Sequence, residues 1–359
     1  MKDAVYVIAE AGVNHNGSLE LAKSLVENAA KSGADAVKFQ TFKSERLVSA
    51  KAGKADYQKR LTSRDESQLD MLQKLELSEE AHEQLVQHCR YWNIDFLSTP
   101  FDEESLIFLS DRLQLNRLKF SSGDLSNLPF LLKAAYTGKE MIVSTGMATL
   151  GEIEDCLSVI AFGLTRAGEA PSMNAFRLAY ASEEGQAALR NKVSLLHCTT
   201  EYPTPYEDVN LNGMQTLAQA FGLRTGYSDH TLGGEVSVAA VALGAKIIEK
   251  HFTLDKNMEG PDHQASLEPK ELTAMVSQIR HIELAMGSQV KYPARSEIKN
   301  MIPARKSIVA ARNIQAGEPF HETNLTIKRP GNGLSPAMYW ELLGKKANRS
   351  YVKDECIQW

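Results

Sequence analysis

The chain has 359 residues, of which 43% are hydrophobic and 24% are charged, a composition typical of a globular protein with one large domain and a small one. The formal net charge of -5 argues against a nucleic-acid-binding surface, although it is compatible with a local anion site. The four cysteines, Cys89, Cys156, Cys198 and Cys356, are widely spaced without a C-x-x-C pair, so we expect reduced thiols rather than a disulfide framework.

The first predicted strand begins almost at Met1, with no charged and then apolar leader before Val5. No apolar run approaches the roughly 18 residues that are needed to cross a bilayer. We therefore expect a cytoplasmic enzyme that has neither a membrane nor a nucleic-acid partner.

Short β-rich runs alternate with helical patterns over residues 1–286. Eight runs are mostly apolar on both faces, as buried parallel strands are: Ala4–Ala9, Ala36–Gln40, Ile94–Ser98, Leu118–Phe120, Met141–Ser144, Val193–His197, Thr225–Ser228 and Ile247–His251. Helices are expected between them at Leu19–Lys31, Glu79–Tyr91, Glu103–Arg112, Leu150–Phe162, Gly234–Leu243 and Pro269–Met286. This α/β repeat predicts a (β/α)8 TIM barrel, and the lack of G-x-G-x-x-G after the first strand argues against a dinucleotide fold.

Two regions interrupt the repeat. The polar, charged stretch Leu47–Leu75 is interpreted as a loop with a helix that covers the mouth of the barrel, and Leu164–Asn191 as a surface insertion without chemistry. Residues 287–303 form a linker, and strand-like pieces at Lys306–Ala311, Thr326–Pro330 and Leu343–Lys346 predict a compact domain over 304–359. A domain that small has a marginal core, so we expect it to lean on the barrel or on a partner subunit.

Candidate metal ligands end two consecutive strands. His230 and His251 would point into the same mouth, and two neutral imidazoles with open water positions suit a divalent Lewis acid. Asp229 and Glu249 are close to these histidines in the sequence, and their carboxylates could accept hydrogen bonds from the imidazole nitrogens that do not bind the metal. A purely structural role for either histidine is the alternative.

Two lysines on β-rich runs are candidates for an anion site. A lysine that points inward is costly unless it meets an anion, and Lys38 and Lys119 occupy such positions. Ser122, Ser144 and Ser228 can bring hydroxyl groups close to a phosphate. The alternative is that each lysine points outward between helices.

Three further residues have a functional and a structural interpretation. Glu10 enters the mouth after an apolar strand, where it could activate water or relay a proton, or simply neutralise Lys38. His15 is interpreted as a loop histidine. Arg329, in the exposed turn Lys328–Gly333, is either solvated or a clamp that reaches an anionic or polar substrate.

These residues lie in strings that resemble the sialic acid synthase family of sugar-nonulosonate synthases. The strings are Ile8–Gly17 (IAEAGVNHNG), Val37–Lys43 (VKFQTFK), Leu97–Asp102 (LSTPFD), Ser121–Leu128 (SSGDLSNL), Val143–Met147 (VSTGM), Leu196–Pro205 (LHCTTEYPTP), Gly226–Thr231 (GYSDHT) and Glu249–Pro269 (EKHFTLDKNMEGPDHQASLEP). The stretch from about Arg305 resembles that family's antifreeze-like SAF domain. The resemblance covers nearly the whole chain in order and leaves out mainly Leu164–Asn191.

The resemblance implies a reaction and a set of roles. A divalent metal, Mn²⁺ first and Mg²⁺ or Co²⁺ as alternatives, would bind His230 and His251 and polarise the aldehyde of an N-acylated mannosamine-type sugar. Carbon 3 of phosphoenolpyruvate would attack that aldehyde, water would add at carbon 2, and phosphate would leave by C–O cleavage. Glu10 is the implied catalytic residue, phosphoenolpyruvate would bind Lys38, Thr99, Lys119, Ser122, Ser144 and Ser228, and the sugar would face Gln40, Tyr202, Glu249 and Asp262. Arg329 would contact the sugar from the partner subunit of a domain-swapped homodimer.

The sugar itself is left open between two branches of the family. Asp65–Leu69 and His197–Pro203 resemble legionaminic acid synthases, which use a 2,4-diacetamido-6-deoxy sugar, whereas Tyr202–Asn212 looks equally like N-acetylneuraminate synthases. A 6-phosphorylated sugar ranks third, because no added basic cluster is present. The rival enzyme is another phosphoenolpyruvate-condensing barrel acting on a phosphorylated aldose, and the rival for the C-terminal domain is an ice- or carbohydrate-binding module.

Overall fold

The computed structural model describes residues 4–49, 52–54 and 67–358. They form two compact units, Met1–Gly287 and Ser288–Trp359. Part of the predicted excursion Leu47–Leu75 lies outside the described residues, with Asp65 and Glu66 of the stretch that resembles legionaminic acid synthases.

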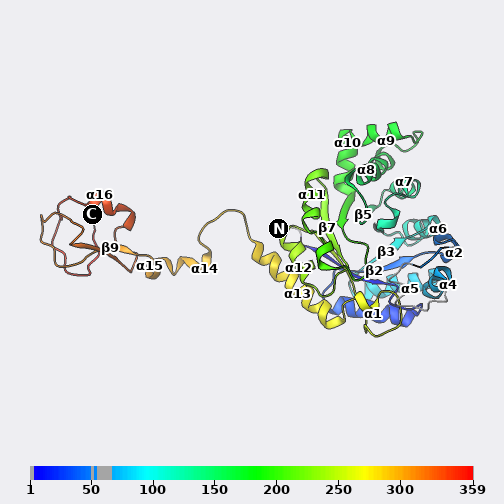
Figure 1. Ribbon diagram of the computed structural model, residues 1–359, viewed down its shortest axis with the longest axis horizontal. Helices are drawn as coiled ribbons and strands as arrows, with labels where there is room; N and C mark the ends of the chain where they lie inside the picture. The colour runs from blue at the N-terminus through cyan, green and yellow to red at the C-terminus, as the bar shows by residue number, and fades with distance from the viewer. Residues whose placement is uncertain (1–3, 50–51, 55–66, 359) are drawn as a thin grey trace. The chain divides into compact units, whose positions relative to one another are not determined.

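Eight strands of the first unit form one sheet of parallel pairs in the order β3-β2-β1-β8-β7-β6-β5-β4. β3 and β4, at the two ends of this order, contact each other, so the sheet is a nearly closed barrel (Figure 1). The predicted (β/α)8 barrel is confirmed. The strands are β1 (Tyr6–Gly12), β2 (Ala36–Thr41), β3 (Asp95–Pro100), β4 (Arg117–Phe120), β5 (Glu140–Ser144), β6 (Val193–His197), β7 (Arg224–Asp229) and β8 (Ile247–His251).

Helices follow the strands and begin where the sequence supplies caps. Ser18 accepts a hydrogen bond from the backbone of Leu21 and starts α1 as predicted, while a capping box at Thr149 starts α8. The predicted helix Glu103–Arg112 is instead α6 followed by a π-helical turn, Phe108–Arg112. No helix of the described ranges has both the length and the apolar character needed to cross a membrane. The helices of this unit are α1 (Leu19–Lys31), α2 (Ser44–Leu47), α4 (Gln68–Leu75), α5 (Glu79–Tyr91), α6 (Glu103–Ile107), α7 (Leu128–Tyr136), α8 (Leu150–Thr165), α9 (Met173–Tyr180), α10 (Glu183–Lys192), α11 (Asn212–Phe221), α12 (Glu235–Ala242) and α13 (Pro269–Met286).

The predicted insertion contains two helices. α9 and α10 pack against α8, where the rings of Phe162 and Phe176 lie 5.1 Å apart in an edge-on arrangement (Figure 1). α10 ends at Lys192, directly before the first residue of β6. The insertion therefore joins the barrel at the amino-terminal end of a strand, opposite the end where barrel enzymes carry their chemistry.

The strands bury both faces, as their apolar sequences predict. Outward side chains such as those of Val7 and Phe39 belong to the large core beneath the helices, whereas Ile8, Leu97 and Ile247 belong to a separate cluster inside the barrel. Side chains alternate between these two environments because successive residues of a strand face opposite ways. At Gly226 a Cβ atom would lie 2.3 Å from the carbonyl oxygen of Ile247, so this part of β7 accepts only glycine.

The second unit has its own small core. Short helices α14 (Arg295–Ile298) and α15 (Met301–Ala304) precede an antiparallel pair, β9 (Ser307–Ala310) and β10 (Leu325–Lys328), and α16 (Tyr339–Leu342) follows. The core comprises Ile308, Ala310, Ile314, Phe320, Leu325, Leu342, Ala347, Tyr351 and Ile357. The strand predicted at Leu343–Lys346 is reduced to an isolated bridge between Lys346 and Pro319.

Candidate active site

Strand alternation places polar side chains inside the barrel at its carboxyl end. On β1, Ile8 lies in the inner apolar cluster and Glu10, two residues on, lies above it; Ile247 and Glu249 repeat the arrangement on β8. Glu10 and Thr99 are inside their strands rather than just after them, because β1 and β3 extend farther than the sequence predicted. A register shift between Glu10 and Gly12 breaks the pairing of β1 with β2 at this level.

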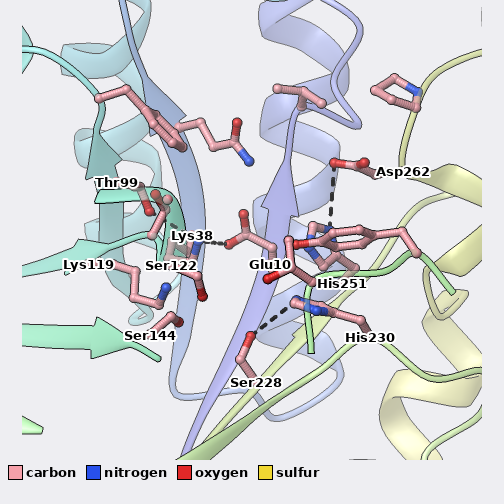
Figure 2. A pocket seen from close by; sticks show the side chains of 18 of the residues that line it. Glu10, Lys38, Thr99, Lys119, Ser122, Ser144, Ser228, His230, His251 and Asp262 are labelled. Atoms are coloured by element: carbon pink, nitrogen blue, oxygen red, sulfur yellow. Dashed lines mark hydrogen bonds and ion pairs between the residues drawn. The ribbon is translucent and has the colours of Figure 1, made fainter. Parts of the chain in front are cut away.

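One cavity of about 420 Å³ gathers the predicted site residues of the barrel. Its lining includes Glu10, Lys38, Gln40, Thr99, Lys119, Ser122, Ser144, Tyr202, Ser228, His230, Glu249, His251 and Asp262. Figure 2 shows the two lysines with Thr99, Ser122 and Ser144 on one side of Glu10, and the two histidines with Asp262 on the other. Arg329 directly follows β10 in the second unit, and its contact with a substrate stays a prediction.

The two lysines point inward, so the outward alternative is wrong. Lys38 is 4% exposed, its Nζ lies 2.5 Å from Oε2 of Glu10 and 3.8 Å from Oε2 of Glu249, and it donates to Oγ1 of Thr99. Nζ of Lys119, which is 3% exposed, lies 3.6 Å from Oε1 of Glu249 and donates to the carbonyl of Phe120. Two cations therefore face one enclosed space.

Burial and these ion pairs set the protonation of the acidic groups. Burial raises the pKa of Glu10 to about 7, although Lys38 opposes the shift. Burial acts the same way on Glu249, but Lys119 and Lys38 outweigh it and lower its pKa. Burial also raises the pKa of Asp262 to about 6. Glu10 can therefore both hold and release a proton near neutral pH.

Hydroxyl groups complete the side of the cavity that carries the lysines. The backbone N–H of Gly146 donates to Oγ of Ser122 at 2.9 Å, and Oγ of Ser122 lies 3.2 Å from Sγ of Cys198. Ser144 ends β5 beside them and is 3% exposed. These groups, with the two ammonium groups, match the needs of a phosphate or carboxylate.

The two histidines are held as neutral imidazoles. Burial lowers the pKa of His230 to about 4 and that of His251 well below its usual value. Nδ1 of His230 lies 2.6 Å from the carbonyl of Thr199, which can only accept, so Nδ1 carries the proton and Nε2 keeps its lone pair. Nδ1 of His251 is buried and has no hydrogen-bond partner among the described residues. The ring centroids are 5.6 Å apart.

These two imidazoles fit a divalent cation. Each offers a neutral nitrogen, and a carbonyl fixes the tautomer of one of them, as is usual for metal-bound histidine. Over the residues that the structure describes, no cluster of three or more His, Cys, Asp or Glu side chains forms a complete ligand set. A cation held here would therefore take its remaining ligands from water and substrate, as Mn²⁺ and Mg²⁺ readily do.

Asp229 does not support His230, contrary to the prediction from sequence. It faces out of the barrel, where Oδ2 lies 3.2 Å from Nζ of Lys250 and accepts from Ser237, while Oδ1 accepts from the N–H and hydroxyl of Thr231. Lys250 also donates to the carbonyl of Thr231 at 2.6 Å, and both charged residues are fully buried. Glu249 contacts Ser228 and the lysines rather than a histidine.

Sequence reasoning missed several lining residues. The outer part of the cavity is apolar, with Val13, Met71, Leu72, Leu75 and Phe101, and part of it belongs to the covering helix α4 that the sequence did predict. The apolar period of Gln68–Leu75 was the available signal. His15 lies in the turn after β1 as interpreted, where it is buried and accepts from the N–H of Gly17.

A barrel whose mouth holds two buried lysines, three carboxyl groups and two neutral histidines belongs to the class of barrel enzymes that act on small anionic substrates. The chain belongs to the NeuB family, whose model matches residues 25–291, and a SAF domain matches residues 305–359.

Three relatives illustrate the similarity. The chain is 53% identical over 352 residues to the N,N'-diacetyllegionaminic acid synthase of Campylobacter jejuni subsp. jejuni serotype O:2, covering 98% of both chains. It is 41% identical over 354 residues to the enzyme of that name from Legionella pneumophila, covering 99% of this chain and 93% of that one. Its fold matches the crystal structure of N-acetylneuraminic acid synthetase from Leptospira borgpetersenii in complex with citrate, with a TM-score of 0.68 and 32% identity over 83% of this chain and 90% of that one.

Proposed function

We propose that this chain is a nonulosonic acid synthase that condenses phosphoenolpyruvate with 2,4-diacetamido-2,4,6-trideoxymannose to give N,N'-diacetyllegionaminic acid and phosphate. The observation that carries the proposal is the meeting of Lys38, Lys119 and Glu10 in one cavity of a NeuB-family chain. The similarity to two enzymes named for this product favours the diacetamido sugar over N-acetylmannosamine.

The side with the lysines and hydroxyl groups binds phosphoenolpyruvate in this proposal. Lys38 and Lys119 face its phosphate and carboxylate, and Thr99, Ser122, Ser144 and Ser228 add hydroxyl groups around them. Two lysines do not balance a ligand that carries roughly three negative charges next to the carboxyl groups of Glu10, Glu249 and Asp262. This imbalance supports the presence of an additional cation.

That cation is a divalent metal held by His230 and His251, with Mn²⁺ the first choice and Mg²⁺ or Co²⁺ the alternatives. When bound, it supplies Lewis acidity toward the sugar aldehyde. The protein itself holds the two imidazoles neutral by burial and fixes His230 through Thr199.

The chemistry joins carbon 3 of phosphoenolpyruvate to the aldehyde carbon, adds water at carbon 2, and expels phosphate with cleavage of the bond between carbon 2 and oxygen. Glu10, with its pKa near 7, takes a proton from the attacking water and passes it on. Gln40, Tyr202, Glu249 and Asp262 surround the space left for the sugar.

The proposal includes a domain-swapped homodimer in which Arg329 reaches the sugar of the partner's site. The four free cysteines support a reducing, cytoplasmic setting.

Phosphate release from phosphoenolpyruvate tests the proposal. With Mn²⁺ present, 2,4-diacetamido-2,4,6-trideoxymannose should give a higher kcat/KM than N-acetylmannosamine, and EDTA should abolish turnover. A preference for N-acetylmannosamine would make the enzyme an N-acetylneuraminate synthase. Turnover with erythrose 4-phosphate or arabinose 5-phosphate alone would overturn the family-based assignment of the substrate.

His251→Ala tests the metal site directly. The variant should lose Mn²⁺ binding measured by isothermal titration, while the midpoint of its thermal unfolding without metal stays within a few degrees of the parent. Unchanged Mn²⁺ affinity would refute the assignment of His251 as a ligand.

A further inference from the structure

The cavity has two chemically different parts. Its floor carries charged and hydroxyl groups, whereas its outer part is lined by an apolar wall, defined here as Val13, Met71, Leu72, Leu75 and Phe101. Val13, Met71, Leu72 and Leu75 are each less than 10% exposed. Among the described lining residues of α4, only Gln68 is polar.

The apolar wall is a packed structure rather than a chance grouping. Its residues form one hydrophobic cluster with Phe42, and the rings of Phe42 and Phe101 meet edge-on at 6.3 Å. α4 starts in a capping box at Ser67, and near its end the carbonyl of Lys74 would lie 2.3 Å from a Cβ at Gly17. Helix and loop are therefore in backbone contact, which fixes the side chains of α4 over the mouth.

Gly12 marks the passage between the floor and the apolar wall. A Cβ atom there would lie 3.1 Å from Oε1 of Glu10, 3.6 Å from Nε2 of Gln40 and 3.6 Å from Cε1 of His251. The next residue, Val13, already belongs to the wall. An open-chain sugar that had its aldehyde near Glu10 and His251 would have to extend over Gly12 to bring its far end against the wall.

A surface of this kind selects against polar groups. A hydroxyl or phosphoryl group pressed onto it would lose hydrogen bonds to water without gaining partners, whereas a methyl group would lose only its contact with water. We propose that the apolar wall is the specificity determinant for the far end of the sugar, and that it accepts the methyl group of a 6-deoxy sugar and discriminates against a hydroxyl or phosphate at carbon 6. This inference rests on the proposed function, because it assumes an amino-sugar aldehyde in this cavity.

The test compares two substrates that differ only at carbon 6: 2,4-diacetamido-2,4,6-trideoxymannose and its 6-hydroxy counterpart, 2,4-diacetamido-2,4-dideoxymannose. The parent enzyme should prefer the 6-deoxy sugar roughly ten- to hundredfold in kcat/KM, the range that one such group contributes in an apolar pocket. Met71→Gln keeps the length of the side chain but adds an amide, and it should reduce this preference to about threefold or less while the KM for phosphoenolpyruvate stays unchanged. Met71→Leu is the matched apolar control and should keep the preference.

Val13→Thr provides a second probe if Met71→Gln fails to fold, since it replaces one methyl group by a hydroxyl at nearly constant volume. It should also weaken the preference. Equal use of the two sugars by the parent, or an unchanged preference in both polar variants, would overturn the inference and leave the proposed function standing. Absence of turnover with every amino sugar would instead defeat the proposed function, and with it this inference.

Discussion

The buried pair of Lys250 and Asp229 lies directly behind the two histidines, and its removal gives a quantitative test of how the site is positioned. Each charged residue precedes a histidine in the chain, and β7 and β8 pair Asp229 with Lys250 in register. Lys250→Met removes the cation, leaves Asp229 buried beside apolar atoms, and breaks the bond to the carbonyl of Thr231. Losing one partner of a buried pair costs about 3–5 kcal/mol.

For a barrel of this size that loss corresponds to a decrease of roughly 5–8 °C in Tm. The Thr231 turn also carries His230, so we expect the Kd for Mn²⁺ to rise at least tenfold. Differential scanning calorimetry and isothermal titration with Mn²⁺ measure the two effects. Lys250→Arg should restore part of both, because it keeps a cation facing Asp229.

The double variant Lys250→Met with Asp229→Asn tests whether the two side chains stabilise the protein as an interacting pair or independently of each other. Asparagine removes the uncompensated charge, so the double variant should be more stable than Lys250→Met alone. A decrease in Tm below about 2 °C for Lys250→Met, or strictly additive effects in the double variant, would contradict this account of the pair. Unchanged Mn²⁺ affinity despite lower stability would reduce the pair to a purely structural role.

Three other outcomes are expected. Glu10→Gln should lower the rate of phosphate release by about two to four orders of magnitude, while phosphoenolpyruvate still protects the protein against thermal unfolding; near-normal turnover would exclude Glu10 from proton transfer. Arg329→Ala should raise the KM for the sugar, and mixing it with Glu10→Ala subunits should restore part of the activity, whereas no recovery would argue against shared sites. Burial lowers the pKa of His15 to about 3. The His15 imidazole therefore stays neutral in the folded barrel, whereas in the unfolded chain it gains a proton below about pH 6.5. His15 alone should therefore lower the free energy of unfolding by about 1.4 kcal/mol per pH unit between about pH 6.5 and pH 3, in addition to the contributions of His230 and His251. His15→Asn should reduce this slope in thermal unfolding measured from pH 7 to pH 5.

The barrel could be predicted from sequence because the apolar composition of each strand by itself indicates that the strand is buried. β6 and β8 have the predicted bounds, because each apolar run begins directly after a lysine and ends on a histidine. β1 was placed too early because Glu10, a carboxylate in a fully buried position, reads as the end of a strand. Inside a barrel a charged residue does not have to mark the end of a strand, because its carboxylate can pair with a lysine of the next strand, here Lys38.

The direction in which side chains point was harder to predict. Asp229 was expected behind His230 because it is its neighbour in sequence, but neighbours in a strand face opposite sides, and Asp229 meets Lys250 outside the barrel. The apolar wall also escaped prediction. Met71 and Leu72 come together with Val13 and Phe101 only through contacts among three separate connections, which no local pattern contains.

The position of α9 and α10 has a practical consequence. They join α8 to the amino end of β6, and residues 167–174 at the start of this insertion are exposed. New chain termini or a fluorescent reporter domain introduced into this turn would lie at the end of the barrel opposite its mouth and would interrupt no strand. The enzyme thus offers a permissive splice point, suited to circular permutation or to a reporter fusion that follows the protein in living cells without obstructing substrate entry.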